Sequence, residues 1–195
     1  MYKVEAAGDL LMMVGENRPI EASPASPKNP VAILVEAARS GDRDAFGRLY
    51  GLFAPMVHGI LLARVPQIEV DDLVQDVFLL AFKKLPALRD DKAFGGWLAM
   101  ITRNRAMDFY RRSQPSEELT EEMAQKSSFK TEAAEALAAI RALPDAYRET
   151  LVLRLVEGMT GPEIAERTGL THDSVRVNLS RGMKLLREKL MGGQS

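Results

Sequence analysis

The sequence predicts an all-α protein with two small helical domains joined by a flexible acidic linker, the C-terminal domain containing a helix-turn-helix. Apolar residues recur with helical spacing along most of the chain, and no segment alternates apolar and polar residues as a half-buried strand does. A glutamate-rich segment separates the two helical parts. The predicted divisions are an N-terminal extension over 1–30, a helical domain over 31–113, a linker over 114–131 and a helix-turn-helix domain over 132–191.

The first helical domain is predicted to contain four helices, limited by glycine and proline. The extension before it ends in IEASPASPKNP, whose serine, proline and alanine supply no core, so we expect it to be mobile. Gly41 separates the first two helices, Pro55 is expected to kink or interrupt the second, and Pro86 follows the third. The helices are expected at about 31–40, 42–64, 70–85 and 92–112.

The third predicted helix, EVDDLVQDVFLLAFKKL, combines acidic and apolar residues on its outer face. Leu73 and Val77 belong to its inner face, whereas Leu79 and Phe82 point elsewhere, beside carboxylates. Burying such apolar groups in an interface is favourable, and flanking acids discriminate against wrong partners, which indicates a protein partner. In the alternative, Leu79 and Phe82 pack on a neighbouring helix and the acids stay solvated; this helix alone does not decide between them.

The fourth predicted helix, FGGWLAMITRNRAMDFYRR, mixes arginines with aromatic residues. Arginines can follow a phosphate backbone, and Phe109 or Tyr110 could stack on an unpaired base, a combination that suits single-stranded DNA. Trp97 and Phe109 would serve equally well as core residues of a helical bundle. We expect the arginines to point outward and Trp97 inward.

The segment from Thr160 to Lys189 is typical of a helix-turn-helix. Thr160 and Glu163 have the spacing of a capping box, which begins one helix. Gly169 suits a left-handed residue just past that helix, and Thr171 can cap the next one. After the connector, further helices are expected at 132–143 and 145–157.

The last helix is predicted to pack by one face and to contact DNA by the other. Arginine can bind guanine with two hydrogen bonds, lysine neutralises phosphate, and a small apolar side chain can contact a thymine methyl group. The packing face consists of Val175, Leu179, Gly182, Met183, Leu186 and Leu190. The outer face consists of Arg176, Val177, Ser180, Arg181, Lys184 and Arg187. The alternative is a solvated basic helix that ends a bundle.

Charge and composition narrow the function classes. The net charge is only −1, but residues 97–112 carry four arginines against one aspartate, and residues 171–190 carry five basic residues against two acids. Between them, residues 113–135 carry six glutamates against two lysines, a layout that suggests two separate contacts with nucleic acid. No stretch approaches the roughly 20 uninterrupted apolar residues that cross a bilayer, and no secretory signal is recognised, so we expect a soluble cytoplasmic protein without membrane insertion.

The sequence contains no motif typical of a catalytic site or a metal site. The absence of cysteine excludes thiolate metal sites, and the two histidines lie far apart in sequence. Asp72 and Asp76 lie one helical turn apart, but the Glu-x-x-His pairs of carboxylate metal sites in bundles are missing. No nucleophile elbow, phosphate loop or dinucleotide motif occurs. We expect no enzyme, no metal and no cofactor.

Taken together, the motifs resemble a known family. Along the chain stand AFGRLY, DDLVQDVFLLAFKKL, FGGWLAMITRNRAMDFYRR, a variable connector, and a segment that begins LPDAYRETL and ends MKLLREKL. This order is similar to that of extracytoplasmic-function (ECF) sigma factors of the sigma-70 family, and the resemblance covers about residues 31–190. It implies a bacterial protein that binds core RNA polymerase and directs it to particular promoters.

The resemblance also implies roles for individual residues. The acidic third helix would bind the clamp coiled coil of the largest polymerase subunit through Asp72, Gln75, Asp76 and Leu79. The fourth helix would hold the melted minus-ten element through Arg103, Asn104, Asp108, Arg111 and Arg112, and the loop over 86–95 would capture a flipped base. The last helix would bind the minus-thirty-five element in the major groove through Thr171, Ser174, Arg176, Val177, Ser180, Arg181 and Lys184.

Some residues depart from the family pattern. Asn178 and Met183 stand where many relatives have basic residues, so we expect this chain to recognise a different minus-thirty-five sequence. Gly95 and Gly96 are expected to loosen the base-capture loop. Members of the family are commonly held by an anti-sigma protein, so the resemblance implies such a partner, although no residue identifies one.

Two other functions fit parts of the sequence. A polymerase-independent regulator would bind an operator through its helix-turn-helix and would use residues 31–112 for dimerisation or sensing, but it would not need the acidic third helix. A purely structural helical protein would bind no DNA at any salt concentration.

Overall fold

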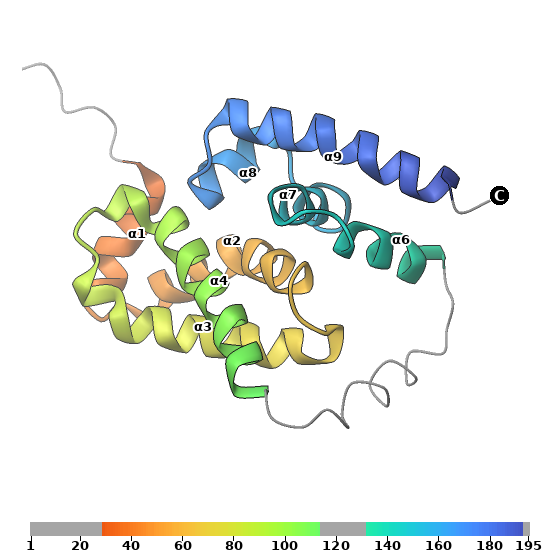
Figure 1. The fold of residues 1–195 in the computed structure, drawn as a ribbon. Helices are drawn as coiled ribbons and strands as arrows, with labels where there is room; N and C mark the ends of the chain where they lie inside the picture. The colour runs from red at the N-terminus through yellow and green to blue at the C-terminus, as the bar shows by residue number, and fades with distance from the viewer. Residues whose placement is uncertain (1–28, 114–131, 193–195) are drawn as a thin grey trace, which may run out of the picture.

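The computed structural model describes residues 29–113 and 132–192, and both ranges fold into helices joined by short turns. The extension and the connector predicted above therefore lie outside the described residues, except at their edges. In the N-terminal domain, the helices are α1 (Pro30–Arg39), α2 (Arg43–Leu62), α3 (Val70–Lys84) and α4 (Phe94–Ser113). In the C-terminal domain, they are α6 (Glu132–Arg141), α7 (Asp145–Leu155), α8 (Gly161–Thr168) and α9 (His172–Gly192) (Figure 1).

Short 3-10 turns replace much of the loop structure expected inside the N-terminal domain. They span Gln67–Glu69 before α3, and Leu85–Ala87 and Asp91–Ala93 between α3 and α4. Arg39 of α1 donates a hydrogen bond to the carbonyl of Leu88 at 3.0 Å and forms an ion pair with Asp91. The segment between α3 and α4 is therefore held against α1.

Helix α2 is the centre of the N-terminal domain. It contacts α1, α3 and α4, and its inward side chains, such as Leu49, Met56 and Ile60, are fully buried. Among the described residues, α2 alone has the length and composition of a membrane span, but it is the core helix of this bundle. The expected interruption at Pro55 is wrong, because α2 runs from Arg43 to Leu62 with Pro55 inside it. Packing against several helices outweighs the hydrogen bond that proline removes.

Local capping sets the helix starts in both domains. Asn29 accepts a hydrogen bond from the Val31 amide at 2.9 Å at the start of α1, and the Asp42 side chain accepts from two amides at the start of α2. Both bonds of the predicted capping box between Thr160 and Glu163 are present at the start of α8. The predicted left-handed glycine is confirmed at Gly169, with a φ of 74°.

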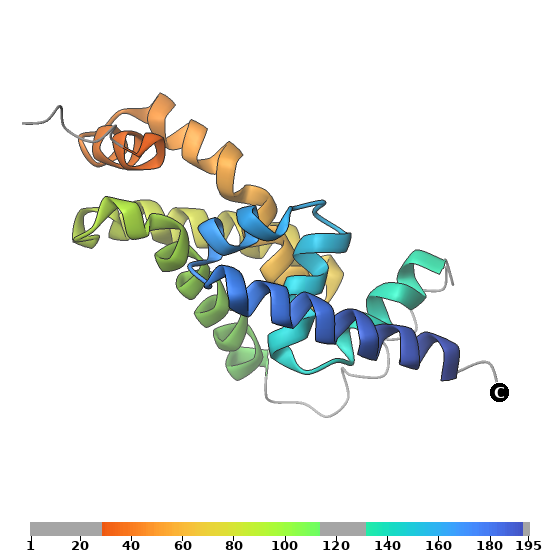
Figure 2. The ribbon, with the colours of Figure 1, turned by 90° about the horizontal axis from the view of Figure 1, so that it is seen from above.

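The two domains pack against each other and share one continuous core. Helix α7 lies against α2, and α8 lies against both α2 and α4 (Figures 1 and 2). At the C-terminal end of α2, Arg141 donates to the carbonyls of Leu62 and Val65 at 2.9 and 3.0 Å. These carbonyls have no partner within the helix, so side chains of one domain complete the helix end of the other.

Glycines lie where the two domains approach most closely. A Cβ atom placed on Gly59 of α2 would lie 2.7 Å from a methyl group of Leu153, and one on Gly95 of α4 would lie 2.5 Å from the carbonyl oxygen of Arg167. Gly95 and Gly96 therefore do not loosen a loop, as the sequence suggested. They belong to the first turn of α4 and let the helix-turn-helix pack on it.

We predict that Thr160→Ala destabilises the protein by about 1 kcal/mol, because the substitution removes the side chain that caps α8. Urea denaturation followed by circular dichroism would measure the loss. Glu166→Ala, which changes an exposed residue of the same helix, should leave the stability nearly unchanged. Equal midpoints for Thr160→Ala and the unaltered protein would contradict the prediction.

Candidate nucleic-acid interface

Helix α9 presents the predicted DNA-binding residues on one exposed face. Val175 and Leu186 are buried on the opposite side, and α7 approaches closely at Gly182, where an added Cβ atom would lie 3.0 Å from Leu151. Seven residues of the predicted set are exposed: Thr171, Ser174, Arg176, Val177, Ser180, Arg181 and Lys184. A basic, solvent-exposed helix face of this kind matches the requirements of a recognition helix.

The N-terminal turn of α9 is well ordered by its own side chains. Thr171 accepts a hydrogen bond from the Ser174 amide at 3.1 Å, as the sequence predicts, and Arg176 pairs with Asp173 at 3.0 Å. Met183 and Leu190, which were expected to pack, are instead 38% and 46% exposed. Leu190 lies in the last turns of α9, beyond buried Leu186, whereas Met183 lies beside the contact that Gly182 and Leu186 make and only borders it.

The acidic face of α3 is also exposed. The four residues of the predicted polymerase-binding set, Asp72, Gln75, Asp76 and Leu79, lie on the surface, and Leu79 is 69% exposed. The alternative in which Leu79 packs on a neighbouring helix is therefore wrong. Phe82 behaves differently, because its half-exposed ring lies 4.5 Å from that of Phe46, centre to centre.

The arginines of α4 fall into two groups. Arg111 and Arg112 are exposed, as expected. The expectation is wrong for Arg103 and Arg105, which form ion pairs with Glu149 of α7 and Asp76 of α3. Trp97 is partly buried against the core, in agreement with its predicted inward direction.

The pairing of Arg103 follows from the burial of a carboxylate. Glu149 is 5% exposed and lies between two arginines of the N-terminal domain. Arg103 contacts it at 2.6 and 3.1 Å, and Arg64, which follows α2, contacts it at 2.8 Å. Burial alone would raise the pKa of Glu149, but the hydrogen bonds and charges of the two arginines together outweigh burial and keep the pKa below its usual value.

A second ionisable contact crosses the same interface. His58 of α2 and Glu157, just after α7, lie 2.6 Å apart between Nδ1 and Oε1. The hydrogen bond that His58 donates to Glu157 raises the pKa of His58, burial opposes this increase, and the charges of Glu157 and Asp71 add to it. The imidazolium is therefore favoured where the two domains meet.

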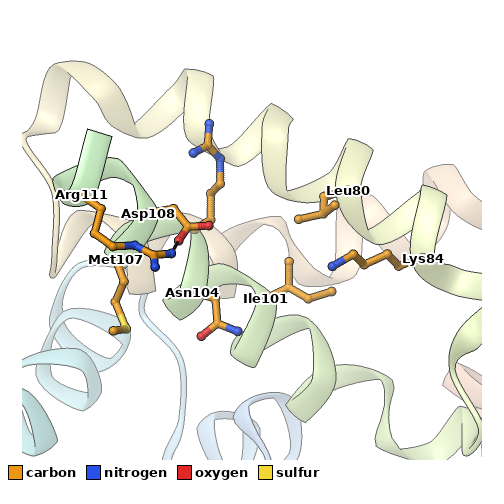
Figure 3. Close-up of a pocket in the computed structure, with 8 residues that line it drawn as sticks. Leu80, Lys84, Ile101, Asn104, Met107, Asp108 and Arg111 are labelled. Carbon is orange, nitrogen blue, oxygen red and sulfur yellow. Dashed lines mark hydrogen bonds and ion pairs between the residues drawn. The ribbon is translucent and has the colours of Figure 1, made fainter. Parts of the chain in front are cut away.

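Three residues of the predicted minus-ten set, Asn104, Asp108 and Arg111, line a shallow pocket between α3 and α4. In Figure 3, Asn104, Asp108 and Arg111 lie along α4, opposite Leu80 and Lys84 of α3. The pocket has a volume of about 390 Å³ and mixes apolar walls with charged rims. Asp108 accepts a hydrogen bond from Arg111, which lowers the pKa of Asp108.

Sequence reasoning did not identify Glu149, Arg64 or His58 as important residues. One indication was available, since Glu149 lies three and four positions before Val152 and Leu153, on the apolar face of the predicted helix. A carboxylate on such a face needs a charged partner, but the sequence does not show which arginine supplies it. Within residues 29–113 and 132–192, no group of three or more acidic or histidine side chains could hold a metal ion.

Comparison with known proteins adds independent findings. The family described as Sigma-70 region 2 matches residues 49–115, and the family described as Sigma-70, region 4 matches residues 133–186. The RNA polymerase sigma factor NccH of Alcaligenes xylosoxydans xylosoxydans is 30% identical over 181 residues, covering 83% of this chain and 95% of its own. The RNA polymerase sigma factor SigZ of Bacillus subtilis is 34% identical over 129 residues, covering 63% and 73% of the two chains.

A solved structure shows a similar fold. CnrH in complex with the cytosolic domain of CnrY is 28% identical, with a TM-score of 0.58 that covers 86% of this chain and 100% of the CnrH chain. CnrH is an RNA polymerase sigma factor of Cupriavidus metallidurans. The similarity therefore spans both helical domains.

We predict that His58 makes the folded protein more stable at about pH 6 than at about pH 8.5. The pKa of His58 is raised above 6.5 in the folded state, so its contribution is fully present below pH 6.5 and is lost as the pH rises through the raised value. Urea denaturation at both pH values would measure the difference. His58→Gln should reduce it, because the substitution removes the ionisable ring. An unchanged pH dependence in His58→Gln would contradict this assignment.

Proposed function

The chain belongs to the sigma-70 family of RNA polymerase sigma factors, in the ECF group, and we propose which of its surfaces act in promoter-specific transcription initiation. As a sigma factor, it binds core RNA polymerase and directs initiation at particular promoters. The observation that carries the assignment of surfaces is the capped helix-turn-helix, whose last helix exposes its whole predicted DNA-binding set.

We propose that α3 binds core polymerase. Its exposed acids and Leu79 combine an apolar contact with charges that fix its register on a partner. Arg105 pairs with Asp76 but leaves 47% of the Asp76 side chain exposed, so this carboxylate remains accessible. A regulator that acts without polymerase would have no use for this surface, and family membership does not favour that alternative.

We propose that α9 binds the minus-thirty-five element in the major groove. Arg176 and Lys184 pair with Asp173 and Glu188 of the same helix, but their side chains are 78% and 77% exposed and can reach base edges and phosphates. Val177, on the same face, offers a methyl-sized apolar contact to thymine.

We propose that α4 holds the melted minus-ten element. Asn104, Arg111 and Arg112 are exposed along this helix, and Tyr110 is half-exposed at its C-terminal end. Tyr110 donates a hydrogen bond to the carbonyl of Arg64 at 2.7 Å, which fixes its ring on the surface where a base could stack. Arg103 belongs to this set only when it is released from Glu149.

The remaining partners follow from the same function. Polymerase and promoter DNA are cytoplasmic, where we place this chain, and we assign it no catalytic step, cofactor or metal. CnrH has been solved with the cytosolic domain of CnrY, and we include an anti-sigma protein among the partners of this chain.

We predict that Asp76→Arg weakens binding to core polymerase at least about tenfold, because it places a positive charge in an acidic docking surface. Surface plasmon resonance with immobilised core enzyme would measure the affinity. Glu166→Arg makes the same change of charge at an exposed residue of α8 and should bind normally. Normal binding by Asp76→Arg would show that α3 is not the docking surface.

We predict that Arg181→Ala costs about 1–3 kcal/mol in binding to a promoter duplex that contains the preferred upstream element. The preferred sequence would be selected from a genomic library by in vitro transcription with core enzyme. Fluorescence anisotropy over a range of salt concentrations would then measure the affinity, which should fall steeply with salt. Lys189→Ala, near the far end of α9, should have a much smaller effect. A loss of equal size in both variants would argue against base reading by Arg181.

A further inference from the structure

We propose that Asp173 is a positioning residue for base recognition, whose carboxylate holds Arg176 in the orientation that binds guanine in the upstream promoter element. This inference deepens the proposed function and rests on it, because it takes α9 as the helix that enters the major groove. Its new content is that an acidic side chain on the DNA-facing surface of α9 determines specificity and lowers the affinity for DNA in general.

Asp173 lies on the same face of α9 as the residues proposed to contact DNA. Arg176, Val177 and Ser180 follow it at three, four and seven positions, which is the spacing of one helix face. The Asp173 side chain is 86% exposed, so packing does not account for its position. The face that would meet DNA therefore carries a carboxylate in the first turn, where recognition helices contact base edges.

A carboxylate at this place opposes DNA binding in general. Basic residues that neutralise phosphates supply most of the affinity for any DNA, and an acidic residue on the same surface offsets part of it. The helix dipole favours an acid in the first turn, and the exposed ion pair of Asp173 with Arg176 adds little to stability. Stability of the helix end accounts for an acid in this turn, but it does not require that the acid face DNA.

The contact with Arg176 gives the carboxylate a function. Nη2 of Arg176 donates a hydrogen bond to Oδ1 of Asp173 at 3.0 Å, while 78% of the arginine side chain is exposed. An exposed arginine has many rotamers, and this ion pair favours those that direct the guanidinium toward the N-terminal end of α9. The guanidinium carries five N–H donors, so the contact leaves donors for the O6 and N7 acceptors of guanine.

The backbone that carries Asp173 is held by the cap of α9. The Ser174 amide donates to the Thr171 hydroxyl at 3.1 Å, and the Thr171 hydroxyl donates to that of Ser174 at 2.7 Å. Buried Val175 anchors the following residue in the core. The carboxylate is therefore presented from a rigid turn, as the orientation of a base-reading group requires.

A second ion pair on α9 provides a matched comparison. Nζ of Lys184 lies 4.0 Å from a carboxylate oxygen of Glu188, and the Lys184 side chain is 77% exposed. A lysine ammonium binds phosphate as a point charge and has no planar fork to orient. Removal of Glu188 should therefore leave the base preference unchanged, whereas removal of Asp173 should reduce it.

The test measures the base preference of the full chain assembled with core polymerase. Promoter duplexes would differ only in the upstream element, with each position changed in turn to the other three bases. We expect Asp173→Ala to lower the discrimination for guanine at one position by about tenfold, because Arg176 is no longer oriented. Asp173→Asn, whose amide oxygen can still accept from Arg176, should keep most of the discrimination, and Glu188→Ala should keep all of it. A merely structural role of Asp173 would instead weaken binding to every duplex alike and would overturn the proposal.

A double variant tests whether Asp173 acts through Arg176. In an Arg176→Ala background, Asp173→Ala should cause no further loss of discrimination at that position, because no guanidinium remains to be oriented. A further loss of equal size would overturn the proposal, since it would mean that Asp173 itself reads a base, such as the amino group of cytosine.

The same measurements separate this inference from the function on which it rests. If the unaltered chain with core polymerase prefers no upstream sequence, the proposed role of α9 fails, and the role of Asp173 fails with it. If the unaltered chain shows a preference that Asp173→Ala leaves unchanged, only the role of Asp173 is overturned.

Discussion

The buried carboxylate of Glu149 is the interaction on which the arrangement of this protein depends. It comes from α7, but both of its charged partners, Arg64 and Arg103, belong to the N-terminal domain. A carboxylate at 5% exposure is stable only while it is paired, so the contact ties the position of the C-terminal domain to that of α4. The glycine contacts and the arginine cap on α2 follow from the same close approach.

This constraint divides the proposed DNA-binding and polymerase-binding surfaces into two classes. The predicted binding faces of α3 and α9 are exposed while the two domains pack together, so their proposed partners can reach them. The α4 surface is only partly available, because Arg103 is bound across the interface while Arg111 and Arg112 remain in solvent.

Much of the fold could be predicted because it depends on local interactions. Helical spacing of apolar residues located the helices to within a few residues, and Thr160, Gly169 and Thr171 marked the turn by their own capping chemistry. The exposed residues of α9 and α3 followed from helix periodicity in the same way. Two predictions failed where packing between distant parts of the chain decides the outcome. The predicted interruption at Pro55 is absent from α2, and Met183, which was predicted to pack, is exposed.

By itself, the sequence determined the helical class, the division into two domains, the helix-turn-helix and the chemical character of each exposed helix face. These properties depend on residues close together in the chain, whose spacing and capping can be read directly. Only the tertiary structure decided that the two domains pack against each other and that Arg103 pairs with Glu149. It also decided that Gly95 and Gly96 allow the close approach of the helix-turn-helix. Arg103 and Glu149 are 46 positions apart, and contacts over such distances depend on how whole helices pack. The spacing of neighbouring residues does not show this packing.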